Sequence, residues 1–186
     1  MSKCIRLILL VVLNCTYWLV PLAAQVSFEL KTSPEVDFIF SSIADYKSGI
    51  TRFNSLKLNV STDRRWDLSV KSTTADWSVV ESYGSNGTVP SLDMLELRVR
   101  NASSTPLISD FFSVTDNDQY LIGSSVTDID VPCPNSGTNV AGNYLTTPSC
   151  YEFFVDFRIT PGIDPVNYLR PGLYRLEIVF TISEDL

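Results

Sequence analysis

The chain has 186 residues, of which 45% are hydrophobic and 19% charged, and its 14 Lys and Arg oppose 21 Asp and Glu to give a formal charge of −7. A nucleic-acid backbone would repel such a chain, so nucleic acid is excluded as a general partner. Histidine is absent, which excludes Ser-His-Asp and Cys-His catalysis, two-histidine metal sites and imidazole pH switches.

Residues 1–24 have the plan of a secretory signal peptide. They begin with Lys3 and Arg6, continue through an apolar stretch that starts at Leu7, and end in small residues before Gln25. Without them, 12 basic and 21 acidic residues remain and the charge becomes −9. We therefore predict an exported protein of the periplasm, the cell surface or the extracellular medium, with a single domain over residues 25–186.

An uncleaved anchor helix and a lipid attached to Cys15 are the alternatives for this segment. Pro21 and Ala23-Ala24 favour cleavage, and Cys15 precedes residues that are still apolar, unlike the cysteine of a lipidation site. No later apolar stretch is long enough to span a bilayer, so we expect no membrane span in the mature chain.

Cys133 and Cys150 are the two cysteines of the mature chain, because Cys4 and Cys15 leave with the signal. An even pair in an exported chain indicates a disulfide bond. Closing the 16 intervening residues would stabilise the fold by about 3 kcal/mol. Two free thiols and half of a metal site are the alternatives, but two thiolates leave zinc two ligands short.

Apolar residues recur at every second position along most of the mature chain, which is typical of half-buried strands. In the segment 151–160, for example, Phe157 points inward, whereas Glu152, Asp156 and Arg158 point outward. The predicted strands are 26–30, 36–40, 56–60, 66–70, 78–81, 95–99, 120–122, 151–160 and 174–182. The polar turn 61–65 predicts a hairpin between two of them.

A helical pattern is nearly missing, and the best candidate, 42–48, ends after barely two turns at Gly49. Parallel sheets need crossover helices, so the strands should pair antiparallel. We predict an all-β fold, an antiparallel two-sheet sandwich of Greek-key or immunoglobulin-like form with about 7–9 strands. Phe157 and Phe180 should both face its core, and Glu96, Arg98 and Arg100 should face water.

Candidates for chemistry are few. Asp116-Asn117-Asp118 and the pair Asp128 and Asp130 offer oxygen ligands to calcium, but they lack the spacing of a helix-loop-helix site, and solvated loops are the simpler interpretation. Carboxylate pairs for glycoside hydrolysis remain open by residue type, although most acids fall on outward strand positions or in turns. We therefore predict no cofactor, no metal and no enzymatic activity.

Trp77, Tyr83 and the run Phe111-Phe112 lie nearer loops than strands. Their flat faces could stack on sugar rings, which makes Trp77 and Tyr83 candidate ligand contacts. Trp77 stands beside Val79 and Val80, so packing in the core is the competing interpretation for it.

Three sequons, at Asn59, Asn86 and Asn101, match the N-glycosylation pattern. Asn59 is the poorest acceptor because it falls within a predicted strand.

Several short motifs resemble those of known exported proteins. They include Gln25-Val26-Ser27-Phe28 after the signal, Trp66-Asp67-Leu68, and Pro171-Gly172-Leu173-Tyr174. With these motifs the chain resembles small exported β-sandwich proteins of Bacteroidetes and is loosely similar to cell-wall WxL domains and pilin-like spore coat protein U domains. Phe180-Thr181-Ile182 stands where a second WxL signature would fall.

The resemblance implies a structural or adhesive role at the cell envelope, with a surface protein or a glycan as partner. The first alternative is a pilin-like subunit that self-associates by strand addition through residues 25–31, in which Val26, Phe28 and Leu30 form the inserted stripe. The second alternative is a carbohydrate-binding or glycoside-acting domain.

Overall fold

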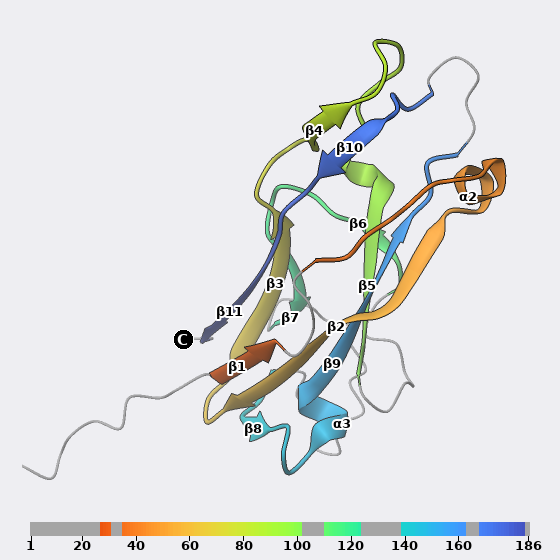
Figure 1. The fold of residues 1–186 in the computed structure, drawn as a ribbon. Helices are drawn as coiled ribbons and strands as arrows, with labels where there is room; N and C mark the ends of the chain where they lie inside the picture. The colour runs from red at the N-terminus through yellow and green to blue at the C-terminus, as the bar shows by residue number, and fades with distance from the viewer. Residues whose placement is uncertain (1–26, 31–34, 102–109, 124–138, 163–167, 185–186) are drawn as a thin grey trace, which may run out of the picture.

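The computed structural model describes residues 27–30, 35–101, 110–123, 139–162 and 168–184 (Figure 1). Strands dominate these residues and pair antiparallel, so the predicted all-β class is confirmed. The strands are β1 (Ser27–Leu30), β2 (Ile50–Thr62), β3 (Trp66–Ser72), β4 (Ser78–Ser82), β5 (Leu95–Asn101), β6 (Phe112–Ser113), β7 (Gln119–Ile122), β8 (Gly142–Asn143), β9 (Glu152–Ile159), β10 (Gly172–Arg175) and β11 (Ile178–Glu184). The helical segments are α2 (Ile43–Ser48), the 3-10 turn η1 (Leu92–Met94) and α3 (Pro148–Tyr151).

The first layer of the fold is a sheet with the strand order β1-β2-β9-β5-β6, and β8 pairs with the end of β2. β9 is central because it pairs with β2 on one side and with β5 on the other. Alternate residues of a strand face the same side. Phe153, Val155 and Phe157 of β9 accordingly lie buried in the core.

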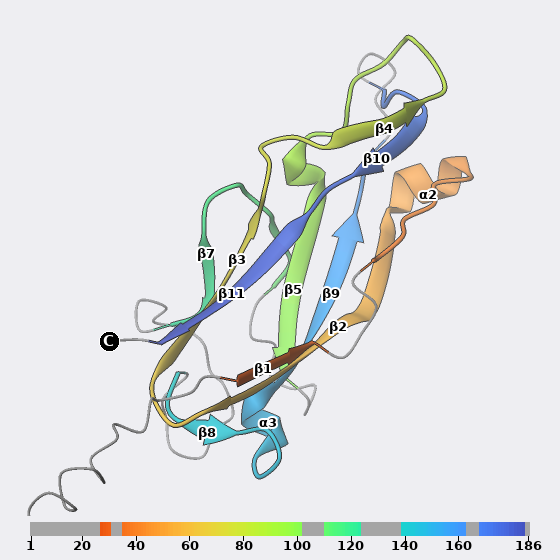
Figure 2. The same ribbon diagram turned by 60° about the vertical axis from the view of Figure 1, so that its left-hand side comes forward.

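The second layer contains the three-stranded sheet β11-β3-β7 and the two-stranded sheet β10-β4 (Figure 2). The predicted strand 174–182 is two strands, because Leu176 and Glu177 separate β10 from β11. The facing strand is interrupted as well. After β3, Ser72 Oγ accepts the N–H of Thr74 at 3.2 Å and donates to the Thr74 carbonyl at 2.7 Å, which forms a polar turn before β4 begins.

The core lies between the layers. Trp66 on β3 and Phe153 on β9 are fully buried, and their ring centroids are 5.9 Å apart. The Trp66 indole N–H donates to the Val140 carbonyl at 3.2 Å, so its one polar atom is satisfied. The buried apolar residues are Leu56, Leu58, Val60, Trp66, Leu68, Val70, Leu95, Leu97, Val99, Val114, Leu121, Ile122, Cys150, Tyr151, Phe153, Val155, Phe157 and Ile159.

The turn between β2 and β3 changes layers, so the predicted hairpin is wrong. β2 belongs to the first layer and β3 to the second, and the two strands do not pair. Within the turn, Thr62 Oγ1 accepts the N–H of Arg64 at 3.1 Å and donates to its carbonyl at 3.0 Å. A short polar turn of this kind is compatible with an arch between two sheets as well as with a hairpin. Here it forms an arch, which lets both strands bury their apolar side chains between the layers.

The predicted strand 36–40 is extended but joins no ladder. Val36, Phe38 and Phe40 are half-buried and pack against the core, so the alternating pattern was right about which side chains face inward. The segment runs from Glu35, whose carboxylate lies 3.8 Å from the Arg175 guanidinium in the second layer, to Asp37, whose carbonyl accepts from Arg52 of β2 at 2.9 Å. It therefore crosses the open side of the sandwich between the two layers.

Candidate binding surface

The two-stranded sheet β10-β4 extends the second layer beyond the rest of the sandwich (Figures 1 and 2). We call residues 78–88 and 168–175 the arm. Its strands pair from Gly172 with Ser82 to Arg175 with Ser78, and a register shift leaves Val80 as an extra residue of β4. Beyond the strands the Tyr83 N–H donates to the Pro171 carbonyl at 2.9 Å, so the two segments of the arm stay together toward its tip.

The predicted turn at Asn86-Gly87 closes the arm. Gly87 has a φ of +100°, and a Cβ added there would lie 2.7 Å from the Arg170 backbone nitrogen. Glycine is therefore required for both conformation and space. The Thr88 N–H donates to the Tyr168 carbonyl at 3.0 Å, and the Arg170 N–H donates to the Thr88 carbonyl at 2.8 Å, which fixes the returning chain.

Large apolar side chains gather on the arm. Ten of them are exposed among the described residues, and five lie here, namely Val79, Val80, Tyr83, Tyr168 and Leu173, with exposed fractions of 45%, 57%, 66%, 48% and 51%. All five positions of β4 are exposed. A group of exposed apolar side chains on one projecting element is typical of a contact surface, because folding alone would bury them.

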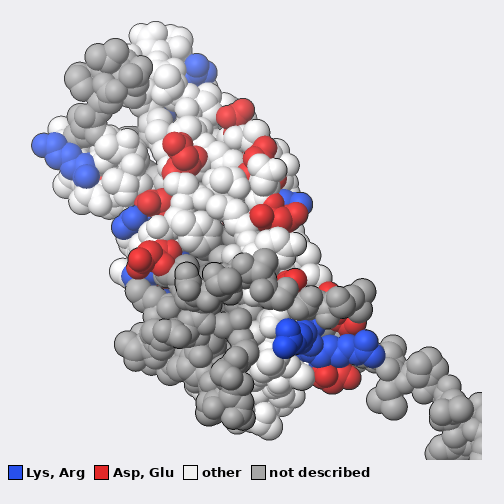
Figure 3. Space-filling model, turned by 180° about the vertical axis from the view of Figure 1, so that it is seen from behind, with Lys and Arg blue, Asp and Glu red and all other residues white. Residues whose placement is uncertain are grey.

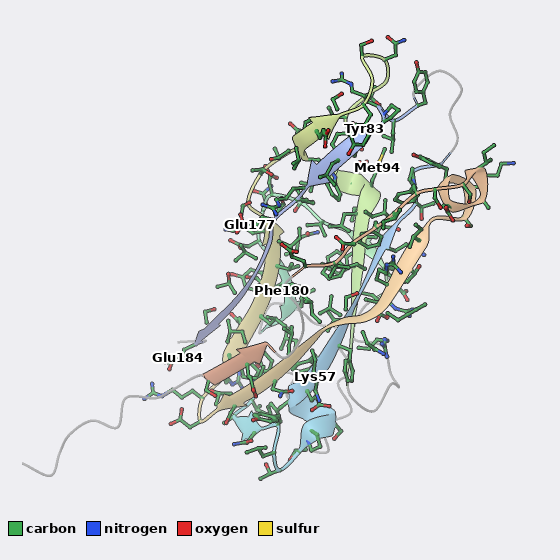
Figure 4. All side chains as sticks on the ribbon, viewed as in Figure 1. Lys57, Tyr83, Met94, Glu177, Phe180 and Glu184 are labelled. Carbon is green, nitrogen blue, oxygen red and sulfur yellow. The ribbon has the colours of Figure 1, made fainter. Side chains whose placement is uncertain are left out.

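The two predicted ligand contacts, Trp77 and Tyr83, both belong to this region but differ in exposure. Tyr83 is exposed on the arm (Figure 4), and its hydroxyl donates to Glu81 Oε2 at 3.2 Å. That hydrogen bond, together with the negative charge of Glu81, raises the pKa of the Tyr83 phenol. Trp77 is half-buried against the core and donates through Nε1 to the Ser91 carbonyl at 3.1 Å. Trp77 therefore holds the base of the arm, while Tyr83 is displayed.

Charged side chains do not gather on the arm as the exposed apolar side chains do. The arm carries one acid, Glu81, and two bases, Arg170 and Arg175, whereas the whole chain has a net charge of −7. On the face seen in Figure 3, acidic side chains are spread over the surface and basic ones lie in separate groups. The arm is therefore a nearly neutral part of an acidic molecule.

A second polar arrangement covers the outer side of the first layer. The pattern predicts that Asp156, Arg98 and Arg100 face water, but the side chain of Asp156 is fully buried and those of Arg98 and Arg100 are only 22% and 14% exposed. Asp156 Oδ2 accepts from Nε of both arginines at 2.8 Å, and Oδ1 accepts from Arg100 Nη2 at 2.9 Å. The prediction of solvent-facing side chains is wrong here, because the three outward side chains lie on the paired strands β9 and β5 and pack against one another.

A bulge in β2 completes this network. The ladder to β9 shifts between Arg52 and Leu56, and Asn54 within the bulge has a φ of +53°. The Asn54 N–H donates to Asp156 Oδ1 at 2.8 Å, and its side-chain Oδ1 accepts from Arg100 Nη2. Burial raises the pKa of the Asp156 carboxyl, but hydrogen bonds from Arg100, the Asn54 N–H and Arg98 outweigh that effect and the pKa is lowered.

Phe111, a predicted sugar-stacking residue, lies under two guanidiniums in this region. Arg98 and Arg158 lie 4.6 Å and 4.1 Å from its ring centroid, and Arg158 Nε also donates to Glu96 at 2.6 Å. Cations already occupy the π system of this ring. The side chains of the outer network therefore contact one another and cover the sheet. The arm is the better candidate for contact with a partner.

The acidic loop of the calcium prediction holds no cluster of ligands. Asp116, Asn117 and Asp118 are exposed, and Asp118 forms an ion pair with Lys71 at 3.2 Å. In the described part of the chain no group of three His, Cys, Asp or Glu side chains is placed to hold a metal ion. Asp128 and Asp130 lie outside the described residues.

The predicted strand donor is found partly within the structure. Ser27–Leu30 form β1, in which Phe28 is paired with Val60 and Leu30 with Leu58 of the same chain. Val26 lies outside the described residues, as does Cys133 of the predicted disulfide. Cys150 lies in α3 and is 2% exposed, and its bond to Cys133 remains a prediction.

Of the sequons, Asn59 is 1% exposed within β2, as its position in a strand predicts, and Asn86 is exposed on the arm.

No protein-family model matches the chain, and no curated protein matches it significantly. Across the residues described here, no helix has both the length and the apolar character needed to cross a membrane.

Proposed function

We propose that this protein is a non-enzymatic, exported module of the cell envelope that acts by structural or adhesive contact. In this proposal the arm is the contact surface, and its partner is a surface protein or a glycan. Residues 1–24 direct export and are removed, as their signal-like plan suggests.

The observation that supports the proposal most is the gathering of Val79, Val80, Tyr83, Tyr168 and Leu173 on one projecting ribbon. Interface centres are enriched in aromatic side chains and depleted of charge. The arm has two exposed tyrosines, and Glu81 is its one acid. Tyr83 offers both a ring face and a hydroxyl, which suits a sugar ring or a protein surface alike.

The experiment uses the purified protein labelled with a fluorophore and incubated with intact cells of the producing species. We expect saturable binding. Tyr83→Ser combined with Leu173→Ser should lower the affinity at least tenfold, because both side chains are proposed contacts with the partner. The fold should be kept, because both are exposed and not core residues. Tyr120→Ser is the matched control, since Tyr120 is 51% exposed on β7, away from the arm. Absence of saturable binding, or equal loss in both variants, would count against the proposal.

A second candidate, assembly by strand addition through residues 25–31, is favoured by the edge position of β1. This strand pairs with β2 over four positions, from Ser27 with Ser61 to Leu30 with Leu58. Its removal would leave that stretch of the β2 edge open to an added strand.

Chromatography of the protein with and without residues 25–31 tests this second candidate. A subunit that uses the segment in trans should form large species only when the segment is present. A protein that remains monomeric and folded with its first strand in place would exclude it.

A further inference from the structure

We infer that the partner of the arm is a second copy of this chain, which adds its own β4 antiparallel to β4 and forms a four-stranded ribbon with the order β10-β4-β4-β10. The inference rests on the proposed contact role of the arm and names its partner. Such pairing requires that the arm be an incomplete sheet, that one edge of β4 be available, and that β4 be compatible with a second β4.

The arm is an incomplete element. Two-stranded ribbons are marginally stable in water, and independent stability needs a third strand or packing on a hydrophobic face. β4 and β10 form a two-stranded sheet, and Val79, Val80 and Leu173 on them are exposed. A further pair of strands would supply the missing hydrogen bonds and cover apolar side chains at the same time.

The available edge belongs to β4. Within the described ranges β10 is the one strand that pairs with β4, which leaves the opposite edge of Ser78–Ser82 without a ladder. Exposed edges are normally protected by charged side chains, proline, bulges or very short length. β4 has two such features, the bulge at Val80 in its ladder to β10 and the charge of Glu81. It contains neither lysine nor proline, and its first three residues, Ser78 to Val80, are uncharged.

The edge is compatible with its own copy. Antiparallel pairing about Val80 sets Val79 of each copy opposite Glu81 of the other and Ser78 opposite Ser82, so no like charges face each other. Two chains that are both acidic repel one another, and that repulsion is weakest where the surface is nearly neutral, as on the arm. A two-fold axis at Val80 also makes the contact closed, so it yields a dimer and not a filament.

Sedimentation equilibrium of the purified protein over a wide concentration range tests the inference. We expect a reversible dimer. Val80→Lys should raise the dissociation constant at least tenfold, because two lysines would meet at the two-fold axis. Val80 is 57% exposed, so the variant should fold, and Tyr120→Lys at the similarly exposed β7 position is the matched control.

A second variant measures the register. Directly opposed residues in antiparallel strands have Cα atoms about 4.5 to 5.5 Å apart, within the range of Cα separations that a disulfide spans. Val80→Cys should therefore form a covalent dimer when oxidised glutathione accepts the two electrons and two protons of the thiols, whereas Tyr120→Cys should not.

A protein that stays monomeric throughout the concentration range would overturn the inference, and so would a dimer that Val80→Lys leaves intact. These outcomes are distinguishable from failure of the proposed function. Labelled protein that binds cells as a monomer through the arm would leave the proposed function standing and would reject the second copy as the partner.

Discussion

Asp156 is the residue on which the outer side of the first layer depends. It is fully buried, it is shared by Arg98 and Arg100, and it holds the Asn54 N–H of the β2 bulge. Asp156→Asn should lower the free energy of unfolding by about 3 to 5 kcal/mol, because it leaves two guanidiniums without their buried counter-ion. Denaturant unfolding measures this. Glu152→Gln, which removes a carboxylate from the more exposed pair with Lys57, should cost no more than about 1 kcal/mol.

The lowered pKa of Asp156 also makes the free energy of unfolding depend on pH. The pKa of Asp156 in the folded state lies below its ordinary value of 3.8, so its ionised form stabilises the fold above that value. This contribution is lost as the pH falls through the folded-state pKa. The gap in unfolding free energy between the natural protein and Asp156→Asn should therefore shrink below about pH 4. A gap that stays constant between pH 7 and pH 2 would show that the carboxylate charge is not what the variant removes.

Phe157 and Phe180 are both predicted from the sequence to face the core, and the structure separates them. Phe157 is 5% exposed at the centre of the first layer, whereas Phe180 on the edge strand β11 is half-buried (Figure 4). Phe157→Ala should lower the unfolding free energy by about 3 to 5 kcal/mol, and Phe180→Ala should cost distinctly less because the site is open on one side. Equal costs in thermal or denaturant unfolding would contradict the assignment of β11 to an edge.

At the scale of elements, alternation identifies which residues form strands but not which strands pair. The inward stripes of β2, β3, β5 and β9 follow from the sequence, because apolar residues occupy every second position along each strand. The arch between β2 and β3 does not follow, since the turn 61–65 fits a hairpin equally well. Nor does the break between β10 and β11, because Leu176 continues the apolar stripe and only the turn in the facing chain ends the ladder.

The candidate surface could be predicted only in part for the same reason. Tyr83 has a signal in the sequence because it is an aromatic residue beside turn-forming glycines. Leu173 and Tyr168 have none, because their exposure depends on β10 pairing with β4 away from the sandwich. The Asp156 network was missed because outward polar residues are normally solvated, and their burial becomes visible only once β9 and β5 are known to be neighbours.

The arm should also be the least protected ladder of the fold. Its ribbon has two strands and exposed side chains, so its backbone hydrogen bonds open without exposing a core. Hydrogen exchange should be fast in β4 and β10 and slow in β9, which lies between two strands. If the arm pairs with a second copy, its protection should rise with protein concentration while that of β9 stays unchanged. Protection of β4 equal to that of β9 in dilute solution would contradict this view of the arm.

For the whole molecule, export predicts a defined N-terminus. The basic start, the apolar stretch and the small residues at Ala23-Ala24 predict cleavage before Gln25. Intact-mass analysis of the protein recovered from the envelope or the medium should therefore give a chain that begins at Gln25. Recovery of a chain that retains Met1 in a membrane fraction would support the anchor alternative instead.

The predicted bond between Cys133 and Cys150 joins export to stability. An exported chain meets an oxidising environment, so the two thiols should be absent from thiol labelling until a reductant is added. Cys150 is buried in α3, directly before β9, and β9 is held by ladders on both sides. Reduction should therefore increase hydrogen exchange between the two cysteines much more than in β9 or β11, because it frees a loop and leaves the ladders intact. If reduction accelerated exchange equally in all of these segments, the bond would have to support the whole sandwich, and the view that alternating strands alone close the core would fail.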